Sequence, residues 1–188
     1  MSAENATLIA WAAFVISWIA AASWSDPPAK QAGLGGEWPY RATMILGGTL
    51  MFGVTKNFFH ETRFSFAPGV EWALFGIAIA GMLFAWWARI YLGRLWSSNV
   101  TKKADHHVVD TGPYALVRHP IYTGLISSVF ATALQAGVLT ALAGAFLLAL
   151  GIYMKARLEE RFLREQLGAD AYDSYRKRVP MLVPFGPR

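Results

Sequence analysis

The chain has 188 residues, of which 55% are hydrophobic and only 15% are charged, whereas about 25% are charged in an ordinary soluble domain. This composition, with its positive mean hydropathy, is typical of an integral membrane protein and argues against a soluble enzyme domain. Cysteine is absent, which excludes disulfides and thiolate chemistry. The net charge of +5 comes from basic residues that flank apolar segments, which indicates membrane topology rather than nucleic-acid binding.

Three apolar segments in the first half of the chain are long enough to cross a hydrocarbon core of about 30 Å as helices. We predict them at about residues 7–24, 38–54 and 68–91. The first is interpreted as a retained helix rather than a signal peptide. A signal peptide begins with basic residues, whereas the residues before this segment include Glu4 and no Lys or Arg. Small residues such as Gly47 in the second segment would let helices approach closely in lipid.

Two further apolar segments follow, at about residues 121–136 and 138–154. The second does not end where its apolar run ends, because residues 155–167 (KARLEERFLREQL) are rich in strong helix formers and contain no breaker. We therefore expect one long helix that continues about three turns into water and ends at Gly168. A short C-terminal helix should follow. The sequence thus predicts an all-α membrane bundle of about five transmembrane helices, forming a single domain over residues 1–188.

The basic residues predict how the bundle is oriented. With five spans, all of the 17 Lys and Arg except Lys56 and Arg63 fall on the side that holds the C-terminus. The positive-inside rule makes that side cytoplasmic and places the N-terminus outside, in what we expect to be a prokaryotic inner membrane. The connection at residues 93–119 and the segment at residues 155–188 then face the same cytosol, where they can meet.

The stretch GPYALVRHPIYTG, residues 112–124, is the densest group of functional side chains in the sequence. Pro120 suits the first turn of a helix, so the fourth span should begin there with His119 at or near its N-cap. The N-terminus of a helix carries unpaired amides and partial positive charge, which favour an anion, and Arg118 adds a fixed cation.

Aromatic and acidic groups accompany this helix end. Tyr114 and Tyr122 supply aromatic faces, while Glu159 and Glu160 come from the neighbouring antiparallel helix. Such a pocket suits a zwitterion with a cationic centre, of which S-adenosylmethionine is one example. Methyl transfer needs neither a metal nor a covalent intermediate, but it does need an aligned acceptor and a site that excludes water.

A simpler interpretation stays open on these residues alone. Arg118 and His119 could be snorkelling side chains at the membrane boundary. Pairs at i,i+4 spacing, such as Lys155 with Glu159, could serve only to stabilise an exposed helix by a few tenths of a kcal/mol each. The adjacent His60 and Glu61 are interpreted as part of a solvated loop and not as metal ligands, so no metal site is expected.

The spacing GPYxxxRHPxYxG resembles the signature of the isoprenylcysteine carboxyl methyltransferase family and of the related phospholipid methyltransferases. The resemblance extends to a second block, with the elements Glu159-Glu160, Gly168, Tyr172, Tyr175 and Arg178-Val179-Pro180. It implies an integral-membrane methyltransferase that uses S-adenosylmethionine without a soluble Rossmann domain. The cofactor site would be built by residues 93–122 and 155–184.

The resemblance also implies roles for individual residues. The expected cofactor-binding residues are His107, Val108, Gly112, Tyr114, His119, Pro120, Tyr122 and Glu159. The expected catalytic residues, facing the reacting carboxylate or orienting the cofactor, are Arg118, Lys155 and Glu159. The family commonly has an Arg before the Glu pair, and either Lys155 or Arg157 could take its place here.

The acceptor implied by the family is a lipophilic small molecule or lipidated carboxylate of the isoprenylcysteine type, entering from the bilayer. A phospholipid or lipid amine and a thiol are alternative acceptors, and no nucleic-acid partner is expected. A second enzyme hypothesis is an NADPH-dependent membrane reductase of the sterol-reductase type, which residues 157–184 also resemble. A third is a transporter or structural membrane protein, against which the uncharged span centres argue.

Overall fold

The computed structural model describes residues 1–24, 30–31, 34–53, 63–93, 96, 101–102 and 109–186. Its helices are α1 (Ala3–Ala20), the 3₁₀ turn η1 (Ala21–Trp24), α2 (Leu34–Met51), α3 (Pro68–Leu92), α4 (Pro113–Leu116), α5 (Pro120–Ala136), α6 (Leu139–Leu167) and α7 (Ala169–Arg178). Two short strands, β1 (Lys30–Gln31) and β2 (Thr101–Lys102), pair antiparallel. Apart from this two-residue ladder, the described residues confirm the all-α prediction.

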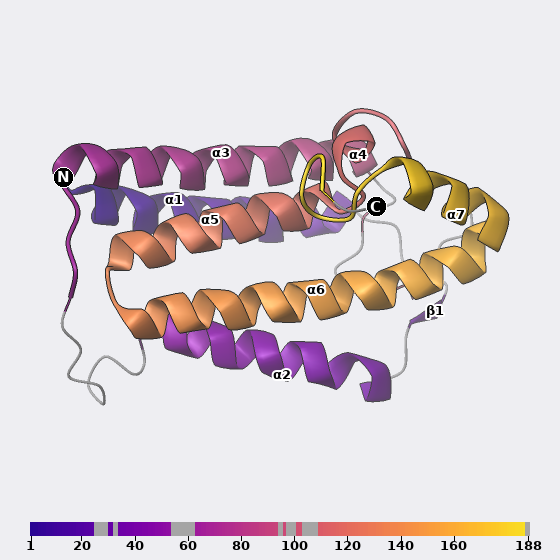
Figure 1. The fold of residues 1–188 in the computed structure, drawn as a ribbon, viewed down its shortest axis with the longest axis horizontal. Coiled ribbons are helices and arrows are strands. Elements are labelled where there is room, and N and C mark those ends of the chain that lie inside the picture. Colours follow the sequence, from indigo (N-terminus) through magenta and orange to yellow (C-terminus); the bar gives the residue numbers. More distant parts are fainter. Residues whose placement is uncertain are drawn as a thin grey trace.

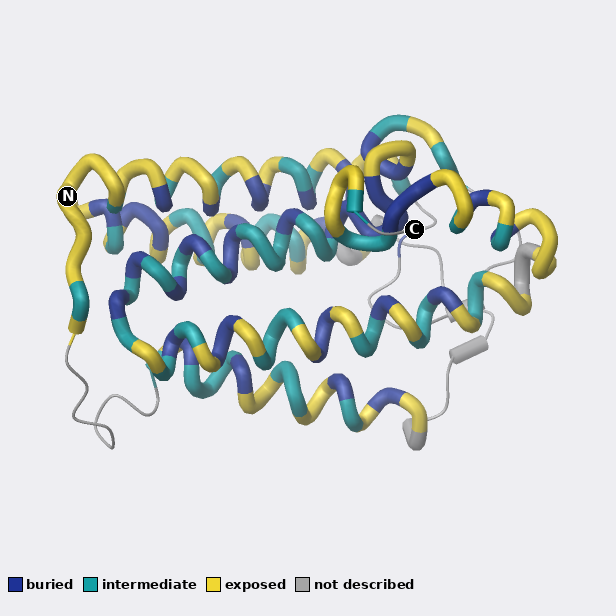
Figure 2. The backbone as a smooth tube through the Cα atoms, viewed as in Figure 1, coloured by how far each residue is buried: buried dark blue, intermediate teal, exposed yellow. Residues whose placement is uncertain are grey.

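The long helices run roughly along one axis, with α2 packed along α6 and with α1, α3 and α5 beside them (Figure 1). In the described part of the chain, three helices are long and apolar enough to cross a membrane: Ala3–Ala20, Pro68–Leu92 and Leu139–Glu165. Their exposed outer faces, visible in Figure 2, carry large apolar side chains such as Ile16 and Phe146. The chain is therefore built as an integral membrane protein, while the number of five spans stays a prediction.

Two of the predicted boundaries are shifted. Helix α1 begins at Ala3 rather than at residue 7, because the Ser2 hydroxyl caps it by accepting a hydrogen bond from the Asn5 amide at 3.2 Å. Helix α2 begins at Leu34 rather than at residue 38, with Pro39 inside it. The long last span behaves as predicted, since α6 runs unbroken for 29 residues and ends before Gly168, whose φ is +86°.

Glycines bring the helices into close contact at two places. A Cβ on Gly124 of α5 would lie 2.3 Å from the Gly81 carbonyl oxygen of α3. A Cβ on Gly144 of α6 would lie 2.6 Å from the Gly47 carbonyl oxygen of α2. Backbone therefore packs on backbone at both crossings, which confirms the role predicted for Gly47 and gives Gly124 of the motif a packing role.

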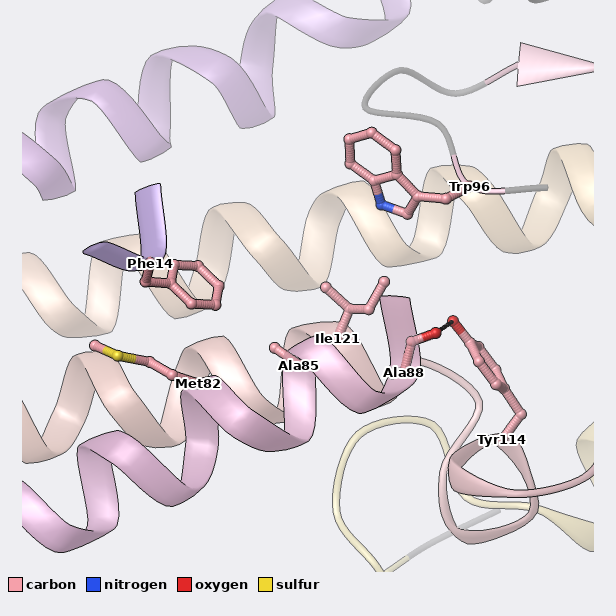
Figure 3. Packing of buried hydrophobic residues seen from close by; sticks show 7 residues of the cluster. All are labelled: Phe14, Met82, Ala85, Ala88, Trp96, Tyr114 and Ile121. Carbon is pink, nitrogen blue, oxygen red and sulfur yellow. Dashed lines mark hydrogen bonds between the residues drawn. The ribbon is translucent and has the colours of Figure 1, made fainter. Parts of the chain in front are cut away.

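A buried cluster ties the candidate site to the membrane helices (Figure 3). It joins α1, α3, α4 and α5 through Phe14, Met82, Ala85, Ala88, Trp96, Tyr114 and Ile121. Fully buried Arg89 supports it by donating to the carbonyls of Ala21 at 2.8 Å and Gly93 at 2.9 Å, with its guanidinium 4.1 Å from the Trp96 ring centroid. The ends of α1 and α3 are thereby fixed next to α4.

Candidate functional site

The start of α5 is bonded to the segment that follows α7. Helix α5 begins at Pro120 with His119 as its N-cap residue, as predicted. The Arg118 amide donates to the Pro180 carbonyl at 2.8 Å, and the His119 amide donates to the Met181 carbonyl at 3.1 Å. The Thr123 hydroxyl donates to the Leu182 carbonyl at 2.6 Å. These bonds return the chain's C-terminal segment to the first turn of α5.

Arg118 and Glu160 form a buried ion pair. Arg118 Nε lies 2.6 Å from Glu160 Oε1, and the two side chains are 4% and 6% exposed. Arg118 Nη1 also donates to the carbonyls of Arg176 at 3.2 Å and Val179 at 2.5 Å. Arg176 Nε adds a longer contact of 3.7 Å to the other oxygen of Glu160. The pair therefore joins the start of α5, the end of α6 and the end of α7.

Glu159 faces a different set of side chains. Its Oε1 accepts a hydrogen bond of 2.6 Å from the Tyr122 hydroxyl and lies 3.7 Å from Lys155 Nζ. Its Oε2 lies 3.7 Å from His119 Nδ1, and the side chain is 19% exposed. The His119 ring stacks on Tyr122 with centroids 5.5 Å apart. We call Glu159, Tyr122, His119 and Lys155 the Glu159 cluster; it confirms that the extension of α6 docks beside the motif.

Of the two candidate basic residues on α6, Lys155 lies in the Glu159 cluster and Arg157 does not. Lys155 Nζ lies 5.6 Å from the Tyr122 ring centroid, and the side chain is 14% exposed. Arg157 is exposed, two residues further along α6. Helical spacing explains the difference, because Lys155 and Glu159 share a face at i,i+4.

Gly112 and Tyr114 hold the connection before α5 against the bundle. Gly112 has a φ of +57°, and a Cβ there would lie 2.6 Å from the Tyr91 ring. The Tyr114 hydroxyl donates to the Ala88 carbonyl at 3.4 Å, and its own carbonyl accepts 2.7 Å from the Tyr175 hydroxyl. Burial, followed by the charges of nearby groups, raises the pKa of Tyr114 well above its usual range, so its hydroxyl stays a donor.

Two predicted cofactor residues, His107 and Val108, lie outside the described residues. In the ranges that are described, no three His, Asp or Glu side chains gather as metal ligands would. Sequence reasoning placed Glu160 in the pocket together with Glu159 and missed its buried ion pair with Arg118. Further along α6, Arg164 pairs with Asp173 of α7 at 2.8 Å. The buried position of Glu160 depends on the C-terminal segment folding back, for which the sequence carries no periodic signal.

The arrangement offers groups for both ends of a zwitterion. The Glu159 carboxylate and the Tyr122 ring can face a cation, whereas Lys155 can face an anion. Within the described residues, His119 Nε2 is a buried polar atom without a hydrogen-bond partner, and it lies 3.6 Å from Glu160 Oε1. Fold and site together define a helical integral-membrane protein with a partly buried polar site at one end of its bundle.

Comparison with known proteins specifies the family. The sequence model of the isoprenylcysteine carboxyl methyltransferase family matches residues 73–165, about half of the chain. This match confirms the resemblance to the family that the motifs indicate. The matched region contains the start of α5 and the Glu159-Glu160 pair of α6.

Two curated relatives and one solved structure are similar to the chain. A protein-S-isoprenylcysteine O-methyltransferase of Schizosaccharomyces pombe is 37% identical over 106 residues, which cover 53% of this chain and 43% of that protein. Methanethiol S-methyltransferase 2 of Bradyrhizobium diazoefficiens is 45% identical over 74 residues, 38% of this chain and 26% of that protein. The matches thus span less than half the length of these relatives.

The solved structure is a eukaryotic intramembrane Ras methyltransferase, an isoprenylcysteine carboxyl methyltransferase. It superposes with a TM-score of 0.57 at 22% identity, covering 78% of this chain and 53% of that chain. This likeness shows a shared fold.

Proposed function

We propose that this chain is a membrane methyltransferase that moves a methyl group from S-adenosylmethionine to a lipophilic acceptor, a carboxylate of the isoprenylcysteine type. The Tyr122–Glu159 hydrogen bond is the observation that carries the proposal, because it joins two motif blocks 37 residues apart. The match to the isoprenylcysteine carboxyl methyltransferase family model supports methyl transfer as the reaction. Residues 1–188 would act as one membrane domain, with the cofactor site built by residues 93–122 and 155–184.

The side chains of the Glu159 cluster fit the proposed methyl donor. Tyr122 donates a hydrogen bond to one oxygen of Glu159. The other oxygen lies 3.7 Å from His119 Nδ1, beyond hydrogen-bond distance, and can accept a hydrogen bond from a ligand. His119 Nε2, buried without a partner, is a second polar group available to a ligand. When bound, S-adenosylmethionine supplies an electrophilic methyl group on a sulfonium centre.

We propose that the predicted cofactor residues contribute to donor binding in different ways. Glu159, His119 and Tyr122 would bind the donor with their side chains, and His107 and Val108 would complete the same wall. Gly112 would shape the wall through its backbone, because a Cβ there would meet the Tyr91 ring. Tyr114 and Pro120 would also shape it through the backbone, because their side chains are buried.

Lys155 is proposed to hold the acceptor carboxylate. An ionised carboxylate is already the nucleophile, so the protein needs only to place it in line and exclude water. The Lys155 ammonium neutralises that charge as a point charge and cannot grip it with two hydrogen bonds, as an Arg would. The buried pair of Arg118 with Glu160 favours a positioning role for Arg118, in which it holds His119 and Glu159 in place.

We further propose that this end of the bundle faces the cytosol of a prokaryotic cell, with the N-terminus outside the inner membrane. The excess of Lys and Arg on the side of the C-terminus supports this orientation.

Ligand binding separates this proposal from the reductase hypothesis. Isothermal titration of the purified protein with S-adenosylhomocysteine should give saturable binding, and titration with NADPH should give none. Tight NADPH binding with no response to S-adenosylhomocysteine would contradict the proposed methyl donor.

A further inference from the structure

The segment after α7 exposes large apolar side chains at the same end of the bundle as the Glu159 cluster. Val183 is 65% exposed and Phe185 is 99% exposed, while Leu116 of the neighbouring α4 is 44% exposed. Leu116 and Phe185 line a common hollow of about 300 Å³. We call Leu116, Val183 and Phe185 the apolar tip. Exposing such an apolar surface to water costs free energy, and exposed apolar patches usually mark a contact with a protein, a ligand or a membrane.

The apolar tip stands on a fixed support. The residues just before it, Pro180, Met181 and Leu182, accept hydrogen bonds from the start of α5 at 2.8, 3.1 and 2.6 Å. In Figure 1 the segment turns back from α7 past α4 towards the bundle. The exposure of Val183 and Phe185 is therefore a property of an ordered turn.

The backbone of the turn is strained at Phe185. The Gly186 amide donates to the Val183 carbonyl at 2.9 Å and closes a four-residue turn with Pro184 at its second position. Phe185, at the third position, has a φ of +62°. Turns of this kind normally have Gly or Asn there, because a bulky side chain is strained at positive φ. An apolar contact of the exposed Phe185 ring would offset the free energy of this backbone strain.

The level of the apolar tip matches the membrane boundary. Trp87 and Tyr91, in the last part of the spanning helix α3, are 47% and 44% exposed, as expected for aromatic side chains at the membrane–water interface. The Tyr91 hydroxyl lies 2.6 Å from the Thr111 hydroxyl, two residues before α4 begins. Helix α4 and the turn beside it therefore lie at the interface.

Basic side chains stand next to the apolar tip. The last turn of α7 carries Arg176, Lys177 and Arg178, and Arg178 lines the same hollow as Phe185. Arg178 also pairs with Asp110 at 3.0 Å, yet its side chain is 62% exposed. Adjacent apolar and basic groups complement a layer of anionic phospholipid headgroups above acyl chains.

We propose that the apolar tip is an interfacial membrane anchor, which inserts into the bilayer boundary while Lys177 and Arg178 bind anionic phospholipid headgroups. The anchor is independent of the proposed reaction. Because the same segment is bonded to Arg118, His119 and Thr123, the lipid surface would hold in place the segment that supports the start of α5.

Spin labelling tests the anchor, since the sequence contains no cysteine. Nitroxide labels would be placed at Val183→Cys, Phe185→Cys and, as a matched aqueous control, Ser174→Cys on the exposed face of α7. The labelled full chain would be studied in nanodiscs holding one copy each, of phosphatidylcholine alone or mixed with phosphatidylglycerol. Collision rates with oxygen and with a water-soluble nickel complex report the depth of each label.

We expect the oxygen-to-nickel ratio to be several-fold higher at 183 and 185 than at 174, and to rise further with phosphatidylglycerol. The double change Lys177→Gln and Arg178→Gln should remove that further rise and keep the ratio found in phosphatidylcholine. Nickel exposure at 185 equal to that at 174 in both lipids would overturn the anchor. Equal depth in both lipids would overturn the headgroup contact.

Discussion

Arg118 and Glu160 are joined by a nearly solvent-free ion pair, with Nε of the arginine 2.6 Å from Oε1 of the glutamate. The two residues lie 42 positions apart, one directly before α5 and the other near the end of α6. Their contact gives two neighbouring glutamates different roles. Glu160 pairs with Arg118 where α5, α6 and α7 meet, while Glu159 belongs to the cluster proposed to bind the methyl donor.

Glu160→Gln should destabilise the protein strongly, because it leaves the charge of Arg118 buried without its partner. The expected cost is about 3–5 kcal/mol, measured as a lower midpoint of thermal unfolding in detergent. The matched control is Asp173→Asn, which removes the exposed pair with Arg164 and should leave the unfolding midpoint nearly unchanged, because water screens exposed ion pairs. Similar midpoints for the two variants would show that the buried pair does not support the fold.

Glu159→Gln should leave the unfolding midpoint nearly unchanged and weaken binding of S-adenosylhomocysteine. The loss of a charged acceptor predicts roughly a 10- to 100-fold higher Kd in isothermal titration, from about 1.5–3 kcal/mol per hydrogen bond to a charged group. Glu165→Gln, on an exposed position of the same helix, serves as control. Unchanged affinity in Glu159→Gln would remove this carboxylate from the proposed cofactor site.

Lys155→Ala should act on the acceptor rather than on the donor. We expect KM for a carboxylate acceptor to rise roughly tenfold or more, equivalent to about 1.4 kcal/mol of lost binding, with the affinity for S-adenosylhomocysteine retained. Arg157→Ala should leave both quantities unchanged, because Arg157 is exposed beside the cluster. The opposite pattern, with the loss in Arg157→Ala, would assign the family's arginine position to Arg157.

Gly124→Ala should destabilise the crossing of α3 and α5, since its Cβ would lie 2.3 Å from the Gly81 carbonyl oxygen. The expected cost is about 1–3 kcal/mol of unfolding free energy. Gly76→Ala on α3 is the control, because a Cβ there meets no atom within 4 Å. That variant should be neutral or gain up to about 1 kcal/mol from helix propensity. Equal effects would exclude close backbone packing as the reason for Gly124.

The two helix ends that build the site could be predicted, because local sequence determines where each helix begins or ends. Pro120 fixes where α5 begins, and the unbroken run of helix formers after Met154 carries α6 past the apolar segment. Helices α5 and α6 are antiparallel neighbours joined at Gly137. The start of α5 and the end of α6 therefore lie at the same end of the bundle, where Tyr122 can meet Glu159.

Other features could not be predicted because they depend on distant parts of the chain. Glu159 and Glu160 are adjacent, and a turn of about 100° per residue separates their faces, so the sequence cannot say which is buried. The end of α7 and the residue after it bury Glu160, because the carbonyls of Arg176 and Val179 accept hydrogen bonds from its partner Arg118. The β1–β2 ladder has two residues in each strand, which is too short for an alternating pattern in the sequence. Helix α2 begins before Pro39, although a proline usually lies in the first turn of a helix.

Carboxyl methylation can be distinguished from the other proposed reactions by a transfer assay. The purified chain in nanodiscs would be incubated with S-adenosylmethionine labelled in its methyl group and with an N-acetylated S-prenyl cysteine, methanethiol or no acceptor. We expect the label in the prenyl cysteine product. Mild base should release this label as volatile methanol, because a methyl ester is base-labile. Label found only in a base-stable thioether, or no transfer to the prenyl cysteine at all, would contradict carboxyl methylation.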